Sequence, residues 1–110
     1  MLLNELTITN VGPFSDSQTV KFSQNENKPI TLIGGQNGLG KTTLINSLAL
    51  VLFGSRSKRI IEFDNYSKYL SEMVHKGKER SEIRLSFTRQ ESGATKQYEV
   101  VREWSKAGNE

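Results

Sequence analysis

Residues 35–42 read Gly35-Gln36-Asn37-Gly38-Leu39-Gly40-Lys41-Thr42. This order matches the phosphate-binding pattern G-x-x-x-x-G-K-[ST], which is informative only between a strand and a helix. Residues 30–33 form a short apolar, β-branched run, and residues 43–53 contain good helix formers up to Gly54. A chance match in a chain of this length is on the order of a few per thousand. We therefore interpret this stretch as a P-loop.

Each part of the loop has its own role in holding phosphate. The glycines at 35, 38 and 40 permit positive φ and let phosphate oxygens approach the backbone N–H groups. The following helix adds its unpaired N–H groups and the positive end of its dipole. Lys41 is expected to reach the β- and γ-phosphates, and the Thr42 hydroxyl to bind Mg²⁺. The expected nucleotide-binding residues are Gly35, Gln36, Asn37, Gly38, Leu39, Gly40, Lys41, Thr42 and Thr43.

The length of the chain predicts one domain, or a piece of one, over residues 1–110, and the predicted strands and helices make its fold class α/β. The chain has 35% hydrophobic and 25% charged residues, typical of a soluble globular protein. The sequence contains no run of about 20 apolar residues and no signal-peptide pattern, so we expect a cytoplasmic protein without a membrane partner. It also contains no cysteine, and the lone His75 is expected to be an ordinary surface residue.

The net charge of +3 lies in the second half of the chain. The densest basic cluster, Arg56, Lys58 and Arg59, directly follows the predicted P-loop helix. Such a cluster is compatible with contact to nucleic-acid phosphates and equally with a solvated basic loop. Charge alone leaves both interpretations open.

Two strands are predicted before the P-loop. Residues 2–10 alternate with Leu6 and Ile8 on one face, and residues 18–22 alternate again after a Gly-Pro turn, with Val20 and Phe22 inward. Simple P-loop kinases and small GTPases usually place the loop after their first strand. The preceding hairpin therefore argues against those classes.

The second half predicts a short helix and a second hairpin. Residues 66–74 place apolar side chains on one helical face, namely Tyr66, Tyr69, Leu70 and Met73. Residues 81–89 and 96–104 alternate around a turn at 91–94, which indicates an antiparallel pair. Arg102 lies on the apolar face, either as a buried ligand or, the interpretation we favour, with its head in water. Residues 105–110 show no recognisable element.

Taken together, these segments resemble the N-terminal lobe of an ABC-type, SMC-like ATPase head, as in RecF, the SMC proteins and the double-strand-break repair ATPases. The resemblance lies in residues 6–14, in the "NGxGKTT" form of the loop, and in residues 49–54. Within that group, residues 1–6, 28–35 and 98–104 look most like DndD, the ATPase of bacterial DNA phosphorothioate modification.

The resemblance implies ATP and Mg²⁺ as cofactors, DNA as a partner, and a second ATPase head, in a homodimer, that closes the nucleotide site. It implies Lys41 as the residue that acts in catalysis. The family's signature motif, its Asp-Glu strand end and its heptad arms do not occur before Glu110. We therefore expect a partial domain that binds ATP and, by itself, does not hydrolyse it.

One feature departs from the resemblance. Several relatives have a basic residue just after the first strand, where this chain has Asn10-Val11-Gly12, so Arg56, Lys58 or Arg59 are candidates to replace it. Three functions stay open: a DNA modification or repair ATPase, a nucleotide-gated DNA-binding scaffold with little hydrolysis, and an unrelated nucleotide kinase or GTPase.

Overall fold

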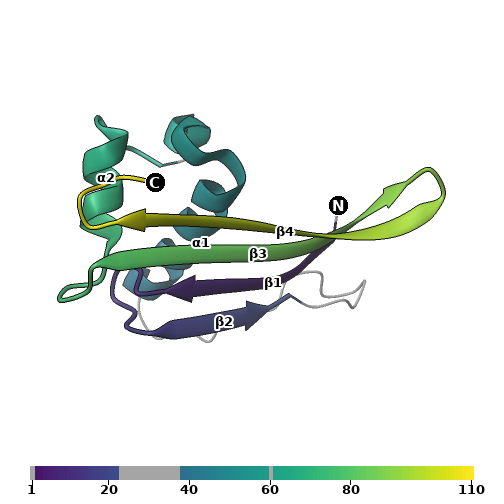
Figure 1. Cartoon of the computed structure of the whole chain (residues 1–110), viewed down its shortest axis with the longest axis horizontal. Helices are drawn as coiled ribbons and strands as arrows, with labels where there is room; N and C mark the ends of the chain where they lie inside the picture. Colours follow the sequence, from purple (N-terminus) through teal and green to yellow (C-terminus); the bar gives the residue numbers. More distant parts are fainter. Residues whose placement is uncertain (1, 23–37, 60) are drawn as a thin grey trace.

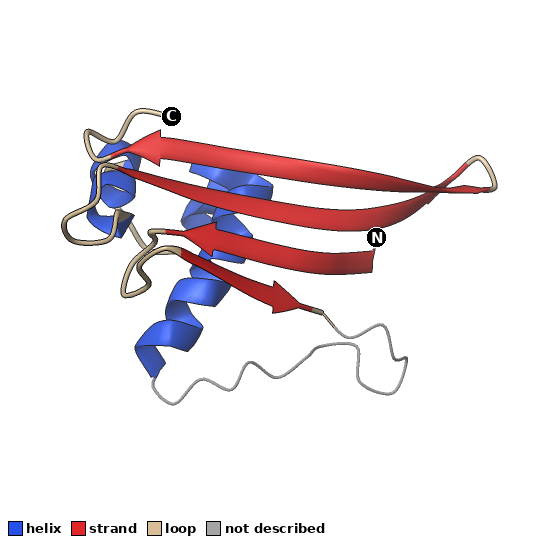
Figure 2. Cartoon of the chain, turned by 60° about the horizontal axis from the view of Figure 1, so that its bottom comes forward, coloured by secondary structure: helices blue, strands red, loops and turns tan. Residues whose placement is uncertain are grey.

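The computed structural model describes residues 2–22, 38–59 and 61–110. Its described part is a four-stranded antiparallel sheet in the order β2-β1-β3-β4, with helices on one face (Figures 1 and 2). The elements are β1 (Leu2–Thr9), β2 (Ser17–Lys21), α1 (Gly38–Phe53), the 3₁₀ helix η1 (Gly54–Arg59), α2 (Tyr66–Met73), β3 (Arg80–Glu91) and β4 (Ala94–Ser105). The predicted P-loop strand at 30–33 lies outside the described residues.

β1 is a central strand of the sheet and pairs on both sides. Leu6 faces Leu85 and Ile8 faces Ile83 across the β1–β3 pair, and all four side chains are buried. Alternation in β1 therefore places one apolar face on the core, as predicted. β2 completes the predicted hairpin, and Val20 packs against the same core.

β3 and β4 form a long hairpin of twelve paired positions. Its turn at Ser92-Gly93 has positive φ at both residues, the conformation that matches the twist of a two-residue hairpin. The hairpin is confirmed, and both strands run further toward the turn than the alternation predicted. Figure 1 shows this end projecting past the helices. Across the two strands, Phe87 stacks on Tyr98 at 5.4 Å between ring centroids.

α1 lies against the sheet through an apolar face. Leu44, Ala49, Leu50 and Val51 are buried, whereas Ile45 stays 62% exposed. The helix begins at Gly38, five residues before the predicted start. Within the described part of the chain, no helix has both the length and the apolar character needed to cross a membrane.

α2 bears out its predicted apolar face. Leu70 is buried, and the other three side chains of that face pack against the core. Asn65 caps the helix by accepting a hydrogen bond from the Lys68 N–H at 2.9 Å. The fully buried Trp104 donates its indole N–H to the Leu70 carbonyl at 2.7 Å, which joins α2 to the end of β4.

Beyond Ser105, which ends β4, the tail forms no helix or strand, as predicted, and it folds back onto the molecule. The Ser105 N–H bonds to the Asn109 carbonyl at 3.0 Å, and Gly108 packs against Ser67 at the start of α2. A Cβ at residue 108 would collide with the Ser67 backbone. The tail is polar and short, and its path is fixed by contacts with α2, with the Glu79 carbonyl and with Arg102.

Candidate nucleotide-binding site

The C-terminal half of the P-loop motif forms the first turns of α1. Residues 38–43 belong to the helix, whereas residues 35–37 and the side chains of residues 38–41 lie outside the described part of the structure. The first turn of a helix has N–H groups without partners inside the helix, and these favour anions. It contains no acidic residue, so no carboxylate of that turn competes with a phosphate. Thr42 is exposed at this end.

The role expected for two of the glycines needs correction. We predicted positive φ at Gly38 and Gly40, but both belong to the helix. A helical turn uses negative φ, so their value at this position is the missing Cβ, which leaves the N–H groups open to a close ligand. Gly35, the third glycine of the motif, lies among the residues not described.

The turn after β1 contacts the start of α1. Gly12 has φ +56°, and a Cβ built on it would lie 3.0 Å from Cγ2 and 3.2 Å from Oγ1 of Thr43. The backbone at Gly12 therefore lies directly against the side chain that follows Thr42. This turn has no basic side chain of its own, as the sequence indicated.

His75 belongs to this region, which the sequence analysis missed. It is half-buried, and its Nδ1 lies 2.8 Å from the Gly12 carbonyl oxygen. Its backbone N–H bonds to the Asn10 carbonyl at 2.9 Å. The prediction of an ordinary surface residue was wrong, because a contact across 63 positions leaves no local signal in a single sequence.

Arg56 and Lys58 lie at the opposite end of α1, in η1. A helix of 16 residues at about 1.5 Å per residue places them about 24 Å along the axis from Gly38. The suggestion that this cluster replaces a basic residue near the nucleotide was therefore wrong, because the whole of α1 separates the two positions. Both side chains are exposed, so contact with another molecule stays open.

Arg102 packs at this second end of α1 instead of extending into water. Its Nη1 donates to Glu110 Oε2 at 2.7 Å. Its guanidinium also lies close to Gly54, where an added Cβ would be 2.9 Å from Nη1. The Tyr66 hydroxyl donates to the same carboxylate. Our preferred interpretation of Arg102 was wrong, since α2 and the tail cover the sheet face on which it lies.

Two tyrosines of α2 have raised pKa values. Burial, reinforced by the Glu110 carboxylate, raises the pKa of Tyr66, and burial raises the pKa of Tyr69. Neither residue is at the Gly38 end of α1. Both therefore belong to the packing of α2 and not to the candidate site.

The described residues contain no cluster of three or more His, Asp or Glu side chains able to hold a metal ion. Asp16, in the turn between β1 and β2, is largely exposed and lies 3.7 Å from the Lys78 ammonium. Glu62 and Asp64 are exposed before α2. Asp16, Glu62 and Asp64 are thus all exposed in turns or loops, whereas the carboxylate that orients water in phosphoryl transfer is expected at the end of a buried strand.

The sheet, α1 and the motif at its start have the fold of an N-terminal lobe of a P-loop NTPase. The chain belongs to the AAA_23 family of AAA domains, whose model matches residues 5–110. Its fold is also that of the recombination mediator protein RecF, in the RecF-ATPrS structure of the RecFOR pathway. That likeness has a TM-score of 0.59 and 22% identity, and covers 97% of this chain and 27% of RecF.

Two curated relatives share shorter segments, and both are the SbcC component of the nuclease SbcCD. The protein of Staphylococcus saprophyticus subsp. saprophyticus is 38% identical over 55 residues, half of this chain. The protein of Treponema pallidum is 45% identical over 49 residues, or 44% of this chain. The chain spans only 5% and 4% of the lengths of these relatives.

Proposed function

We propose that this chain is the ATP-binding lobe of an SMC-like ATPase that acts on DNA in repair. The observation that carries the proposal is the G-x-x-x-x-G-K-T motif entering α1, whose first turn offers N–H groups and no acidic side chain. The AAA_23 match and the RecF-like fold support the ATPase class. The two SbcC relatives support the process, since both are named as parts of a nuclease.

In this proposal the site consists of residues 35–43. Their backbone N–H groups cradle the phosphates, Lys41 places its ammonium against the β- and γ-phosphates, and Thr42 presents its hydroxyl to Mg²⁺. The fit rests on the exposed Thr42 and on the free end of the α1 dipole. Bound Mg²⁺ would neutralise developing charge on the phosphates.

We expect this lobe alone to bind ATP without hydrolysing it. Phosphoryl transfer depends on positioning and charge, and needs a group that orients the attacking water. Asp16, Glu62 and Asp64 are exposed in turns or loops, and the described residues contain no acidic cluster able to hold a metal ion. We propose that a second head in a homodimer and further parts of the protein supply these groups, and that the ATPase works in the cytoplasm, where DNA is available.

For the biological process we prefer DNA repair to DNA sulfur modification. The relatives are named as a nuclease component and a recombination mediator. The likeness to DndD rests on residues 1–6, 28–35 and 98–104 alone. A nucleotide-gated DNA scaffold with little hydrolysis differs from our proposal in one measurable respect: its DNA binding would respond to ATP while turnover stayed negligible.

The test is Lys41→Ala in the full-length protein. Loss of charged hydrogen bonds to two phosphates costs about 3 kcal/mol, or about a hundredfold in ATP affinity. Calorimetry measures binding, phosphate release measures turnover, and circular dichroism checks the fold. Lys21→Ala, on an exposed position of β2, is the matched control and should bind as the wild type. Wild-type turnover in Lys41→Ala, or a preference for guanine over adenine nucleotides, would overturn the proposal.

A further inference from the structure

The turn between β1 and β2 is fixed by bonds to two other segments. Gly12 donates its N–H to the Met73 carbonyl at 2.6 Å, and the Ser81 hydroxyl donates to the Asn10 carbonyl at 2.5 Å. Val11 is fully buried and bridges to Val74. The turn is thus tied to the end of α2 and to the start of β3, and through β1 to the centre of the sheet.

This turn also meets the P-loop helix. A Cβ on Gly12 would lie 3.0 Å from Thr43 Cγ2, so a methyl group there would require a shift of a few tenths of an ångström. Thr43 directly follows Thr42 in the first turns of α1. The position of Gly12 therefore limits how close the start of α1 can come to the sheet.

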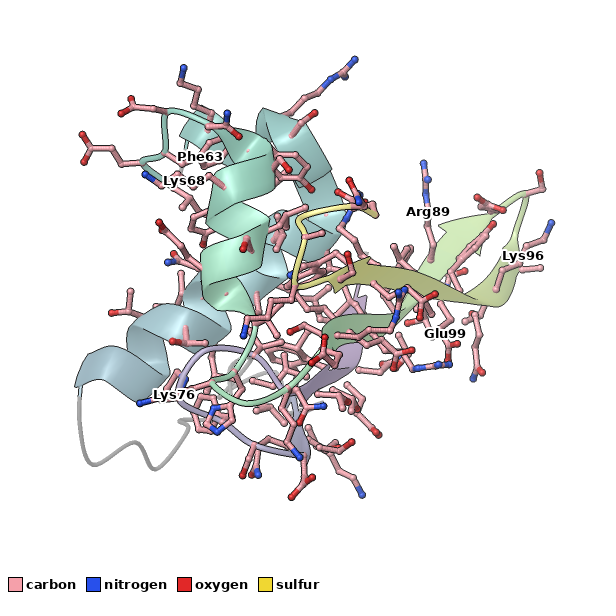
Figure 3. All side chains as sticks on the ribbon, turned by 60° about the vertical axis from the view of Figure 1, so that its left-hand side comes forward. Phe63, Lys68, Lys76, Arg89, Lys96 and Glu99 are labelled. Carbon is pink, nitrogen blue, oxygen red and sulfur yellow. The ribbon has the colours of Figure 1, made fainter. Side chains whose placement is uncertain are left out.

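His75 completes this arrangement from the loop between α2 and β3. A carbonyl oxygen only accepts hydrogen bonds, so at 2.8 Å from the Gly12 oxygen the Nδ1 atom must bear the proton. The same residue holds the Asn10 carbonyl through its backbone N–H. Figure 3 shows the neighbouring Lys76 at this end of the molecule, on the side of the start of α1.

We propose that His75 is a positioning residue for the nucleotide site. By donating Nδ1–H to the Gly12 carbonyl, it holds the turn against Thr43 and so sets where the first turns of α1 meet a phosphate. This inference rests on the proposed function, because it concerns the same ATP site. The physical reason is that misplacing binding groups by about 1 Å costs much of their interaction with a ligand.

The experiment compares ATP affinity in full-length variants by calorimetry. His75→Ala removes the donor and should raise the dissociation constant about threefold to tenfold, the range of one hydrogen bond. His75→Asn places an amide N–H near the position of Nδ1 and should restore affinity to within about twofold. Ser71→Ala is the matched control, because it removes another side-chain bond of α2, 2.6 Å to the Lys106 carbonyl, away from the turn. We expect similar losses in thermal stability for His75→Ala and Ser71→Ala, but a loss of affinity only in the former.

A glycine pair tests the contact with Thr43 independently. Gly12→Ala and Gly77→Ala both place alanine at positive φ, but only Gly12 has a neighbour within 4 Å, since Gly77 faces open space. We expect Gly12→Ala to weaken ATP binding and Gly77→Ala to leave it unchanged. This pair decides the question if His75→Ala does not fold.

The outcomes separate this inference from the proposed function. If the wild type binds no ATP, both fall together. If the wild type binds ATP and Lys41→Ala does not, unchanged affinity in His75→Ala and Gly12→Ala overturns the positioning role alone. A loss in His75→Ala that His75→Asn does not restore also overturns it, because the donor would then not be the cause.

Discussion

At the Gly38 end of α1 the neighbouring contacts are made by backbone groups, whereas at the Gly54 end they are made by charged side chains. The first end meets the glycine turn after β1, held by carbonyl and N–H bonds. The second meets the Arg102 guanidinium, which pairs with Glu110. A helix C-terminus favours cations, so the Arg102 guanidinium has the sign that the dipole predicts there, whereas the N-terminal turn, which favours anions, meets only neutral backbone at Gly12.

Proximity in sequence to the P-loop helix is therefore a poor guide to the nucleotide site. The basic cluster that follows α1 lies a full helix length from Gly38, while His75, more than thirty positions after the motif, bonds to the turn that meets Thr43. Residues that contribute to ATP binding should therefore come from the turn after β1 and the α2–β3 loop. Residues of η1 should affect stability or other partners.

Gly54→Ala is expected to have the largest effect at the second end. It places alanine at φ +56°, with the new methyl group 2.9 Å from the Arg102 guanidinium, which must shift. We expect a loss of about 2 kcal/mol in the free energy of unfolding, measured by urea denaturation. ATP affinity of the folded protein should be unchanged.

Gly93→Ala is the control for this strain. It also has positive φ, but no atom lies within 4 Å of the added methyl group. We expect Gly93→Ala to lose less free energy of unfolding, and this loss is the cost of the backbone conformation alone. The difference between the losses of the two variants then measures the contact with Arg102. Weakened ATP binding by Gly54→Ala would contradict the separation of the two ends.

Charge reversal at Arg56 and Lys58 should have an intermediate effect, and it should change only DNA binding. If these exposed side chains contact phosphates, the plot of log affinity against log salt should become shallower by about two units. ATP affinity should change less than about twofold, given the distance along α1. Reversal at Arg89 and Lys96, which lie on the hairpin, is the matched control. An unchanged salt dependence would identify η1 as a solvated basic loop.

The smallest expected effect is that of Tyr66 on the free energy of unfolding at alkaline pH. Burial and the Glu110 carboxylate raise its pKa in the folded state, so its protonated form is favoured by folding. This stabilisation is complete below about pH 10, the ordinary pKa of tyrosine, and is lost as pH rises further. Tyr66→Phe should make the decline of unfolding free energy above pH 10 shallower.

Tyr98→Phe is the comparison for the alkaline measurement. The pKa of Tyr98 is raised mainly by its hydrogen bond to Glu91, at an exposed position. Solvent screens that interaction, so this substitution should change the slope less than Tyr66→Phe. Equal slopes for the two variants would show that burial of Tyr66 contributes nothing.

Local patterns predicted the elements well. Alternation identified β1 and the β3–β4 hairpin, and one apolar face identified α2. These signals are local because each depends on residues a few positions apart. The start of α1 was placed too late, since the glycines of the motif also fit a loop.

Contacts between distant segments were not predictable. Three such contacts depend on residues that only folding brings together. They are the position of β1 between β2 and β3, the bond of His75 to Gly12, and the pairing of Arg102 with the tail. Histidine and arginine at these positions have the same local sequence signal as exposed ones. The motif of the candidate site was recognisable, but the residues that hold its helix in place were not.

The pairing of β1 with β3 also determines the order in which the protein can fold. Leu6 and Leu85 are about 80 positions apart, whereas β3 and β4 close a two-residue turn, so the second hairpin forms quickly and the first pairing slowly. A two-stranded hairpin alone is marginally stable, so β1 and β2 gain a lasting structure only when β3 arrives. During synthesis the whole phosphate-binding motif therefore leaves the ribosome before the strand that anchors its supporting turn, and nucleotide can be bound only after that strand has joined the sheet.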